Sequence, residues 1–210
     1  MRKKEMKKHS IYFDLLEAME GKGCPICFLA QKSADIYIRA ILNEGVNDPP
    51  LRRKLRNSLG FCGGHAGKLR DLGDSLATAI LYKDLVDEMA HRIERGETEL
   101  EVCPACTSEA EAEKDYLVSF CKYLQEEEFL DRYDASSGLC NGHLNGLWKI
   151  LKDERDREVV LRKETEKLER LSGYLEEYIR KKDYRYSHES PGEERDSWLR
   201  AVEKVAGRRS

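Results

Sequence analysis

Long hydrophobic runs are missing from this sequence. No segment approaches the roughly 18 consecutive apolar residues that a membrane-spanning helix needs. The first twenty residues begin with basic side chains, but Asp14 and Glu17 interrupt the apolar stretch that a signal peptide would require. We therefore expect a soluble protein that is not exported, with a cytoplasmic location and no membrane partner.

Net charge is also almost absent. The 210 residues include 37 basic and 40 acidic side chains, which gives a formal charge of −3. This balance creates no overall field that would attract nucleic acid or an anionic membrane. Local basic clusters do occur, and we expect solvated faces or chain ends there rather than a nucleic-acid interface. The clusters are Arg2, Lys3, Lys4, Lys7 and Lys8; Arg52, Arg53, Lys54 and Arg56; and Arg180, Lys181 and Lys182.

Strand patterns and the usual catalytic signatures are missing too. No segment shows the alternation of β-branched residues that is typical of strands, and only five prolines interrupt the chain. There is no nucleophile elbow, phosphate-binding glycine loop or dinucleotide-binding fingerprint. The sequence therefore predicts an all-α protein that is not an enzyme and whose surface serves a protein partner or self-association.

Cysteine, in contrast, is plentiful and ordered. The count of seven is odd, which fits a reducing compartment better than a closed set of disulfides. CPIC at 24–27 returns as CPAC at 103–106, and GFCGGHAGKL at 60–69 returns as GLCNGHLNGL at 138–147. Each half thus carries Cys-Pro-x-Cys and, after 34 or 33 residues, Cys-x-x-His. Because the reactive side chains repeat while most others do not, the pattern indicates a set of ligands.

The repeated residues predict two metal sites. Each pair spans one helical turn and can present both donors to a single point, and the amide groups and positive dipole end of a helix start favour thiolates. Three thiolates and one imidazole fit a closed, four-coordinate zinc site. One site per repeat gives two zinc ions per chain. Its predicted ligands are Cys24, Cys27, Cys62 and His65 in the first site, and Cys103, Cys106, Cys140 and His143 in the second.

Other interpretations of the thiols are open at this point. Three cysteines and one histidine can also hold an iron–sulfur cluster, which would indicate electron transfer or redox sensing. Cys-Pro-x-Cys can exchange disulfides, although that motif normally lies in a β-α-β unit that we do not find here. Buried cysteines can simply pack at helix starts, but this does not explain why His65 and His143 share the same offset.

Hydrophobic spacing and capping residues predict the order of the helices. The expected helices cover residues 10–20, 25 to about 41, 49–59 with Asp48 as the cap, 62 to about 93 with a bend near Gly73, 104–124, and 140 to about 182. The predicted domains are a first helical repeat with its site at 10–97, a second repeat with its site and a long helix at 98–182, and a polar loop with a closing helix at 183–210. We expect the closing helix to dock through Trp198, Leu199, Val202 and Val205.

The seventh cysteine and the other three histidines are not predicted to be ligands. Cys121 lies one helical turn from apolar neighbours and is expected in the core. His91 is expected on a helix surface, and His9 and His188 in polar ends of the chain.

The paired motifs CPIC…GFCGGH and CPAC…GLCNGH, together with the ending EERDSWLRAVEKVAG, resemble a prokaryotic family defined as a domain of unknown function. The resemblance covers nearly the whole chain and is most specific at the cysteines. It implies the helical architecture and the ligand pattern, and it implies no activity, substrate or catalytic residue.

Overall fold

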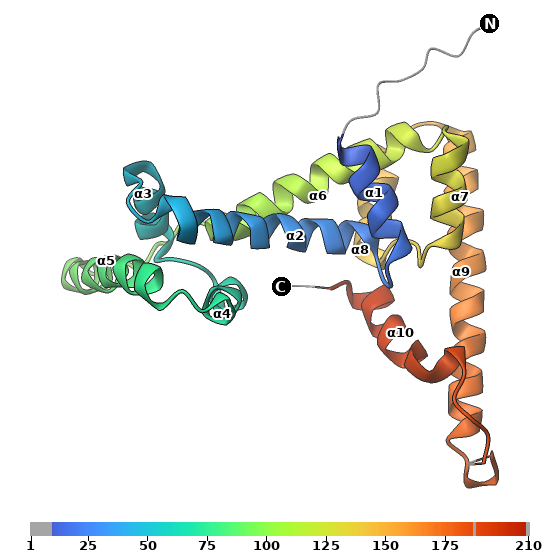
Figure 1. Cartoon of the computed structure of the whole chain (residues 1–210). Helices are drawn as coiled ribbons and strands as arrows, with labels where there is room; N and C mark the ends of the chain where they lie inside the picture. Colours follow the sequence, from blue (N-terminus) through green and yellow to red (C-terminus); the bar gives the residue numbers. More distant parts are fainter. Residues whose placement is uncertain (1–9, 187, 209–210) are drawn as a thin grey trace, which may run out of the picture. The chain divides into compact units, whose positions relative to one another are not determined.

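The prediction of an all-α protein is confirmed. The computed structural model describes residues 10–186 and 188–208, and within these residues it contains ten α-helices and no β-strand (Figure 1). The basic cluster at residues 2–8 and His9 lie outside the described residues. None of the described helices is both long and apolar enough to cross a lipid bilayer.

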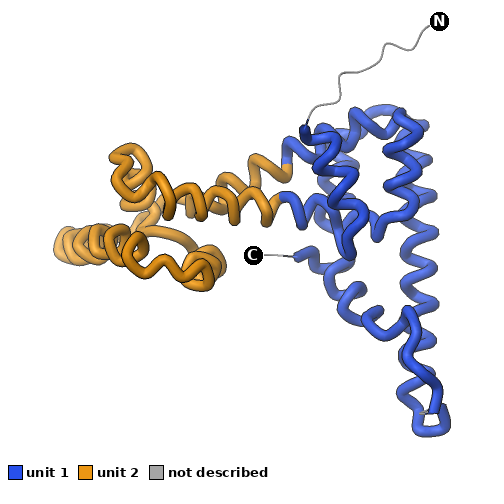
Figure 2. The backbone as a smooth tube through the Cα atoms, in the orientation of Figure 1, with its two compact units in different colours: residues 1–29, 114–209 blue, residues 30–113, 210 orange. Residues whose placement is uncertain are grey.

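The described residues fall into two compact units, one within the ranges 1–29 and 114–209 and the other within 30–113, and α2 and α6 each contribute residues to both (Figure 2). In chain order the helices are α1 (Ser10–Glu20), α2 (Pro25–Ala40), α3 (Pro49–Ser58), α4 (Gly63–Leu72), α5 (Ser75–Arg95), α6 (Pro104–Tyr123), α7 (Glu127–Ala135), α8 (Asn141–Ile150), α9 (Glu154–Lys181) and α10 (Ser197–Ala206). A π-helical turn (Ile41–Gly45) follows α2, and two 3₁₀ turns (Tyr184–Tyr186 and Glu193–Asp196) precede α10.

An aromatic core holds the first unit together. Phe120 of α6 and the α7 residues Phe129 and Tyr133 are fully buried. The ring of Phe120 meets the other two edge to face, with centroids 5.1 and 5.0 Å apart, as aromatic pairs prefer. In this unit α1 packs against α7, and α10 packs against α8 and α9 (Figure 1). Ile26 and Leu147 belong to the same core, which fixes α2 near its start and α8 along its length.

The second unit has a smaller, aliphatic core. Leu55 of α3, Leu69 of α4 and Leu81 and Leu85 of α5 are each at most 6% exposed. Cys103, which directly precedes α6, packs into the same cluster. The core therefore brings the start of α6 close to α4.

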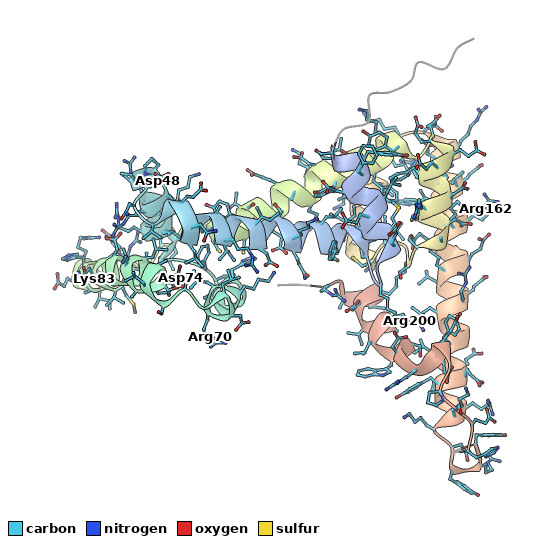
Figure 3. All side chains as sticks on the ribbon, in the orientation of Figure 1. Asp48, Arg70, Asp74, Lys83, Arg162 and Arg200 are labelled. Atoms are coloured by element: carbon cyan, nitrogen blue, oxygen red, sulfur yellow. The ribbon has the colours of Figure 1, made fainter. Side chains whose placement is uncertain are left out.

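Acidic side chains fix the helices of the second unit. Asp48 and Asp74 accept hydrogen bonds from backbone N–H groups in the first turns of α3 and α5, and so cap these helices (Figure 3). Arg52 and Arg56 of α3 bind the carboxylate of Asp84 on α5 at 3.2 and 2.7 Å. The predicted Asp48 cap is confirmed, and half of the basic cluster on α3 serves packing within the unit.

Gly60 and Gly138 occupy the same place in the two repeats, two residues before the cysteine of Cys-x-x-His. Their φ angles are +88° and +73°, which a residue with a Cβ rarely adopts. A Cβ on Gly60 would lie 2.9 Å from Cδ1 of Leu85, and one on Gly138 would lie 2.4 Å from Oε1 of Glu164. Both turns into the Cys-x-x-His helices therefore require glycine.

The predicted long helix from Cys140 to residue 182 is interrupted. α8 ends at Ile150 and α9 begins at Glu154, because Asp153 accepts hydrogen bonds from the first backbone N–H groups of α9. α7, between α6 and the second glycine turn, was not predicted.

The predicted docking face of the closing helix is wrong. Trp198, Leu199, Val202 and Val205 are between 47% and 71% exposed. α10 instead packs through Ser197, which is fully buried, and through Lys204, whose Nζ lies 2.6 Å from Oε2 of Glu164 on α9. A buried carboxylate on the neighbouring helix thus decides which face of α10 turns inward.

Candidate metal centres

The repeated ligands gather into two clusters. In each, three Sγ atoms and one imidazole nitrogen all lie within 4.8 Å of one another. Centre A consists of Cys24, Cys27, Cys140 and His143. Centre B consists of Cys62, His65, Cys103 and Cys106. Centre A lies in the first unit and centre B in the second.

The predicted assignment of one site to each repeat is wrong. Each centre takes Cys-Pro-x-Cys from one repeat and Cys-x-x-His from the other. Cys27 and His143 are 116 residues apart in sequence, yet Sγ of the cysteine lies 3.4 Å from Nδ1 of the histidine. Because the two repeats carry equivalent pairs, spacing alone could not show which pairs meet.

Centre A joins the starts of α2 and α8. Cys24 directly precedes α2 and Cys27 lies in its first turn, while Cys140 is the N-cap of α8 and His143 lies in its first turn. Nδ1 of His143 is 3.3, 3.4 and 3.1 Å from the Sγ atoms of Cys24, Cys27 and Cys140. The Sγ atoms of Cys27 and Cys140 are 3.7 Å apart. Three of these side chains are buried and that of Cys24 is partly buried.

Glu164 of α9 positions the loop that leads into centre A. Its side chain is nearly inaccessible to solvent, and its carboxylate accepts hydrogen bonds from the backbone N–H of Leu139 at 2.8 Å and from Nζ of Lys204 at 2.6 Å. The hydroxyl of Tyr133 also donates to it. This role could not be predicted, because a glutamate in a strongly charged helix gives no sign of burial in the sequence.

Centre B joins the starts of α4 and α6. Cys62 is the N-cap of α4 and His65 lies in its first turn, while Cys103 precedes α6 and Cys106 lies in its first turn. Nδ1 of His65 is 3.3, 3.7 and 3.4 Å from the Sγ atoms of Cys62, Cys103 and Cys106. The Sγ atoms of Cys62 and Cys106 are 3.6 Å apart. Cys62 is exposed, Cys106 is half-buried, and the other two side chains are buried.

Centre B has an acidic neighbour that was not predicted from the sequence. Oε2 of Glu109, on α6, lies 3.4 Å from Nε2 of His65. Because Nδ1 faces the sulfur atoms, a carboxylate this close to Nε2 favours the tautomer that carries its hydrogen on Nε2, although the two atoms do not meet hydrogen-bond geometry. The equivalent position in the first repeat is Ala30, so this support is not repeated. The acidic run that follows CPAC was the available signal.

Charge in centre A is divided unequally between the donors. Burial raises the pKa of Cys24, and the thiol groups of Cys140 and Cys27 raise it further. Hydrogen bonds with the thiol groups of Cys24 and Cys27 lower the pKa of Cys140. Burial tends to lower the pKa of His143, but the thiol groups of Cys140 and Cys27 raise it to about 10. Three thiolates beside a neutral imidazole therefore need a bound cation.

Centre B shows the same need. Burial raises the pKa of Cys106 to about 12, and the thiol group of Cys62 contributes to the rise. Cys62 differs: burial tends to raise its pKa, but the amide of His65 and the neighbouring thiol groups lower it overall. Burial lowers the pKa of His65, which favours the neutral imidazole that binds metals.

The two centres differ in their access to solvent. In centre A the backbone N–H of Arg208 donates to Sγ of Cys27 at 3.4 Å, and a Cβ added to Gly207 would lie 3.4 Å from Sγ of Cys140. The segment after α10 therefore lies over centre A. In centre B, Cys62 is exposed.

The other candidate residues lie outside both centres. Cys121 packs against the aromatic core of the first unit, and burial raises its pKa to about 11. His91 is exposed on α5, with Nδ1 3.7 Å from Oε2 of Glu94, and His188 is also exposed. These placements agree with the core and surface positions that the sequence predicted.

Comparison with protein-family models gives two matches along the chain. The model described as "Family of unknown function (DUF6062)" matches residues 6–100 and residues 90–210. The chain belongs to this family. The resemblance inferred from the paired cysteine motifs is thereby confirmed.

One relative of the chain has a similar length. It is the "Uncharacterized 23.9 kDa protein in xynA 3'region" of Caldicellulosiruptor sp. (strain Rt8B.4), which is 30% identical over 202 residues, covering 92% of this chain and 99% of the relative. No solved structure matches the chain. Neither the family nor the relative carries an activity in its description, so function has to be argued from the two centres.

Both centres of this DUF6062 protein fit a single four-coordinate cation. Around one zinc ion, with sulfur at about 2.3 Å and nitrogen at about 2.0 Å, tetrahedral geometry places ligand atoms about 3.5–3.8 Å apart. The S–S distances above are 3.6 and 3.7 Å, and the S–N distances run from 3.1 to 3.7 Å. All seven cysteines are free thiols. The donors are therefore already arranged to bind a metal ion.

Proposed function

We propose that this is a non-catalytic helical protein that binds two zinc ions, one in each centre, and whose surface serves a protein partner or a second copy of the chain. The observation that carries the proposal is the convergence of the eight repeated ligands on two points, each with three sulfur atoms and one imidazole nitrogen within 4.8 Å. This donor set is typical of structural zinc.

The distances between donors support zinc over the alternative of an iron–sulfur cluster. In a [4Fe–4S] cluster each protein ligand binds a different iron atom, and in a [2Fe–2S] cluster only two ligands share an iron, so all four ligands are never as close together as four ligands of one ion. In centre A, Nδ1 of His143 lies 3.1–3.4 Å from all three Sγ atoms, and in centre B, Nδ1 of His65 lies 3.3–3.7 Å from all three. Both sets of distances suit one shared ion.

A closed site fastens helices rather than processing a substrate. Four protein ligands leave no coordination position for water or substrate, which argues against hydrolytic chemistry. The ion in centre A would join the starts of α2 and α8, and the ion in centre B those of α4 and α6. In structural zinc sites the binding free energy, about 10–16 kcal/mol in zinc-finger peptides, is largely folding free energy. Removing the metal should therefore loosen the unit that holds it.

The thiols also bear on location. Reduced cysteines that bind metal persist in a reducing compartment, and all seven cysteines are free. We propose a cytoplasmic protein on this basis.

Metal analysis with an absorption spectrum, after anaerobic purification, tests the identity of the metal. We expect a colourless protein with about two zinc ions per chain. A brown protein that absorbs at about 400 nm would reject zinc in favour of iron–sulfur clusters. A protein that binds neither metal would reject the proposal as a whole.

Paired substitutions test which ligands share an ion. The variant Cys24→Ala/Cys140→Ala removes two ligands from centre A, so it should lose about one zinc per chain and keep the other. The variant Cys24→Ala/Cys62→Ala removes one ligand from each centre and should lose both. If each repeat held its own ion, the two variants would give the opposite result, because Cys24 and Cys62 would then share one site.

A further inference from the structure

A cavity of about 200 Å³ lies beside centre A, within the first unit. Its walls come from α9, α10, the turn at residues 135–138 and the segment that leads into α2. Cys24 and Cys140 form part of one wall. The proposed zinc sites do not explain this cavity, because all four ligands of centre A already converge on one another.

The walls carry four cationic side chains and one anionic side chain. Lys167 and Arg170 come from α9, Arg200 and Lys204 from α10, and Glu203 is the acidic member. Nζ of Lys204 forms an ion pair with Oε2 of Glu164 at 2.6 Å. Nε of Arg200 lies 2.9 Å from Oδ1 of Asp196, and the guanidinium of Arg200 lies over the ring of Tyr174. Glu203 accepts from the guanidinium of Arg208. Lys167 and Arg170 remain as the source of surplus positive charge.

Lys167 is a buried cation with donors to spare. Its side chain is 6% exposed, its Nζ donates to the backbone oxygen of Asp134 at 2.7 Å, and the ring of Tyr133 lies 5.1 Å away. An ammonium has three N–H donors. The nearest carboxylate, that of Asp134, is 3.9 Å from this Nζ and is bound at 2.7 Å by Lys163. Burial accordingly lowers the pKa of Lys167.

Arg170 follows Lys167 by three residues, so both lie on one side of α9. Its side chain is exposed at the rim of the cavity, and among the described residues its guanidinium forms no hydrogen bond or ion pair. A guanidinium offers five N–H donors in a planar fork that matches a carboxylate or a phosphate. Arg170 and Lys167 thus provide an anion-binding pair on one wall of the cavity.

We propose that this cavity binds a small organic anion, with its carboxylate or phosphate group held by Arg170 and Lys167 and its apolar body against Ala135, Leu171 and the ring of Tyr174. The volume is below the roughly 300–1,000 Å³ of pockets for drug-sized ligands, so it suits a molecule no larger than a single substituted ring. Neutral molecules of the same shape lack the group that the two cations recognise.

The test uses the full chain with its metal and measures binding by calorimetry at constant ionic strength. The probes are 4-fluorobenzoate and phenyl phosphate, with 4-fluorobenzamide as the neutral analogue. We expect at least one anion to bind with a Kd of about 1 mM or tighter, and the neutral analogue not to saturate. The stronger of the two anions shows whether a carboxylate or a phosphate is preferred.

Two variants on α9 make the test specific. Arg170→Gln should weaken binding of the anion about tenfold, because a hydrogen bond to a charged group is lost. Arg162→Gln is the matched control: it removes the same charge from another exposed position of the same helix, which does not line the cavity and lies on the side away from α10 (Figure 3). It should leave the affinity unchanged.

Three results would overturn the proposal. The first is that neither anion saturates the protein at about 10 mM. The second is that Arg170→Gln and Arg162→Gln bind the anion with equal affinity. The third is that Arg170→Gln loses zinc, which would mean that Arg170 and Lys167 balance the charge of centre A. Metal content is measured on every sample. Two zinc ions per chain without anion binding would reject the cavity proposal and leave the proposed zinc sites standing.

Discussion

Glu109 offers a single-residue test of how centre B is supported. Its carboxylate lies 3.4 Å from Nε2 of His65, and removing such a partner typically lowers metal affinity about 10–100-fold. We expect Glu109→Gln to weaken zinc binding by this factor in competition with a chromogenic chelator, and only at centre B. Glu111→Gln, an exposed glutamate on the same helix, should have no effect. Equal affinities for both variants would show that Glu109 does not orient the ring.

The identities of the ligands could be predicted from sequence, but their partners could not. Cys-Pro-x-Cys and Cys-x-x-His each place two donors on one helical turn, which is local geometry. Which turns meet depends on packing between distant segments, and the repeat makes both pairings equally compatible with the spacing. The roles of Glu109 and Glu164 could not be predicted for the same reason. Glu109 lies beside His65, and Glu164 accepts a hydrogen bond from Leu139, and no local pattern encodes either contact.

The turn before α8 depends on a glycine that adopts a positive φ. Gly138→Ala would force a Cβ into the left-handed region, at a cost of about 1–3 kcal/mol, and against Oε1 of Glu164, which hydrogen bonds hold in place. We expect the free energy of unfolding to fall by at least this amount in denaturant titrations. Gly173→Ala, in the exposed interior of α9 with no atom near the added Cβ, should instead stabilise by about 0.5–1 kcal/mol. An unchanged free energy of unfolding in Gly138→Ala would show that this turn does not require glycine.

The orientation of α10 predicts a contrast between two aromatic residues. Phe129→Ala, in the aromatic core, should cost about 3–5 kcal/mol of stability, because its side chain is fully buried. Trp198→Ala should cost well under half of that, since Trp198 is 47% exposed. Thermal or denaturant unfolding of the two variants measures the difference. Equal losses would indicate that α10 docks through its apolar face after all.

Most of the helices were predictable because their signals are local. Pro25, Pro49 and Pro104 begin helices, Asp48 caps α3, and Gly73 ends α4, as the structure shows. The misses arise where packing decides. α7 is short and rich in charge, and only its burial of Phe129 and Tyr133 gives it a role. On α10 the apolar side looked like the docking face, but the buried Glu164 draws Lys204 inward instead.

For the chain as a whole, the two centres should release metal at different rates. Cys62 of centre B is exposed, whereas centre A has three buried ligands and lies under the segment that includes Arg208. A chromogenic chelator should therefore extract zinc in two phases, the faster one from centre B. Cys62→Ala should lack the fast phase and Cys140→Ala the slow one. If Cys62→Ala lacked the slow phase instead, centre B would be the centre that releases zinc more slowly.

Metal loss should also loosen the two units separately, because each has its own core and its own centre. In Cys62→Ala we expect amide hydrogen exchange to speed up within residues 30–113 and to stay slow in α8. Acceleration throughout the chain would show that the units depend on a single ion.

The pairing of each Cys-Pro-x-Cys with the Cys-x-x-His of the other repeat also has a consequence during synthesis. All four ligands of centre B lie between the two ligand pairs of centre A along the chain. The ribosome therefore completes the four ligands of centre B first. Cys27 is synthesised 116 residues before His143, its partner in centre A. At about 5–20 residues per second this interval lasts roughly 6–23 s. During translation the thiols of Cys24 and Cys27 are thus the ones open to oxidants and to the wrong ion.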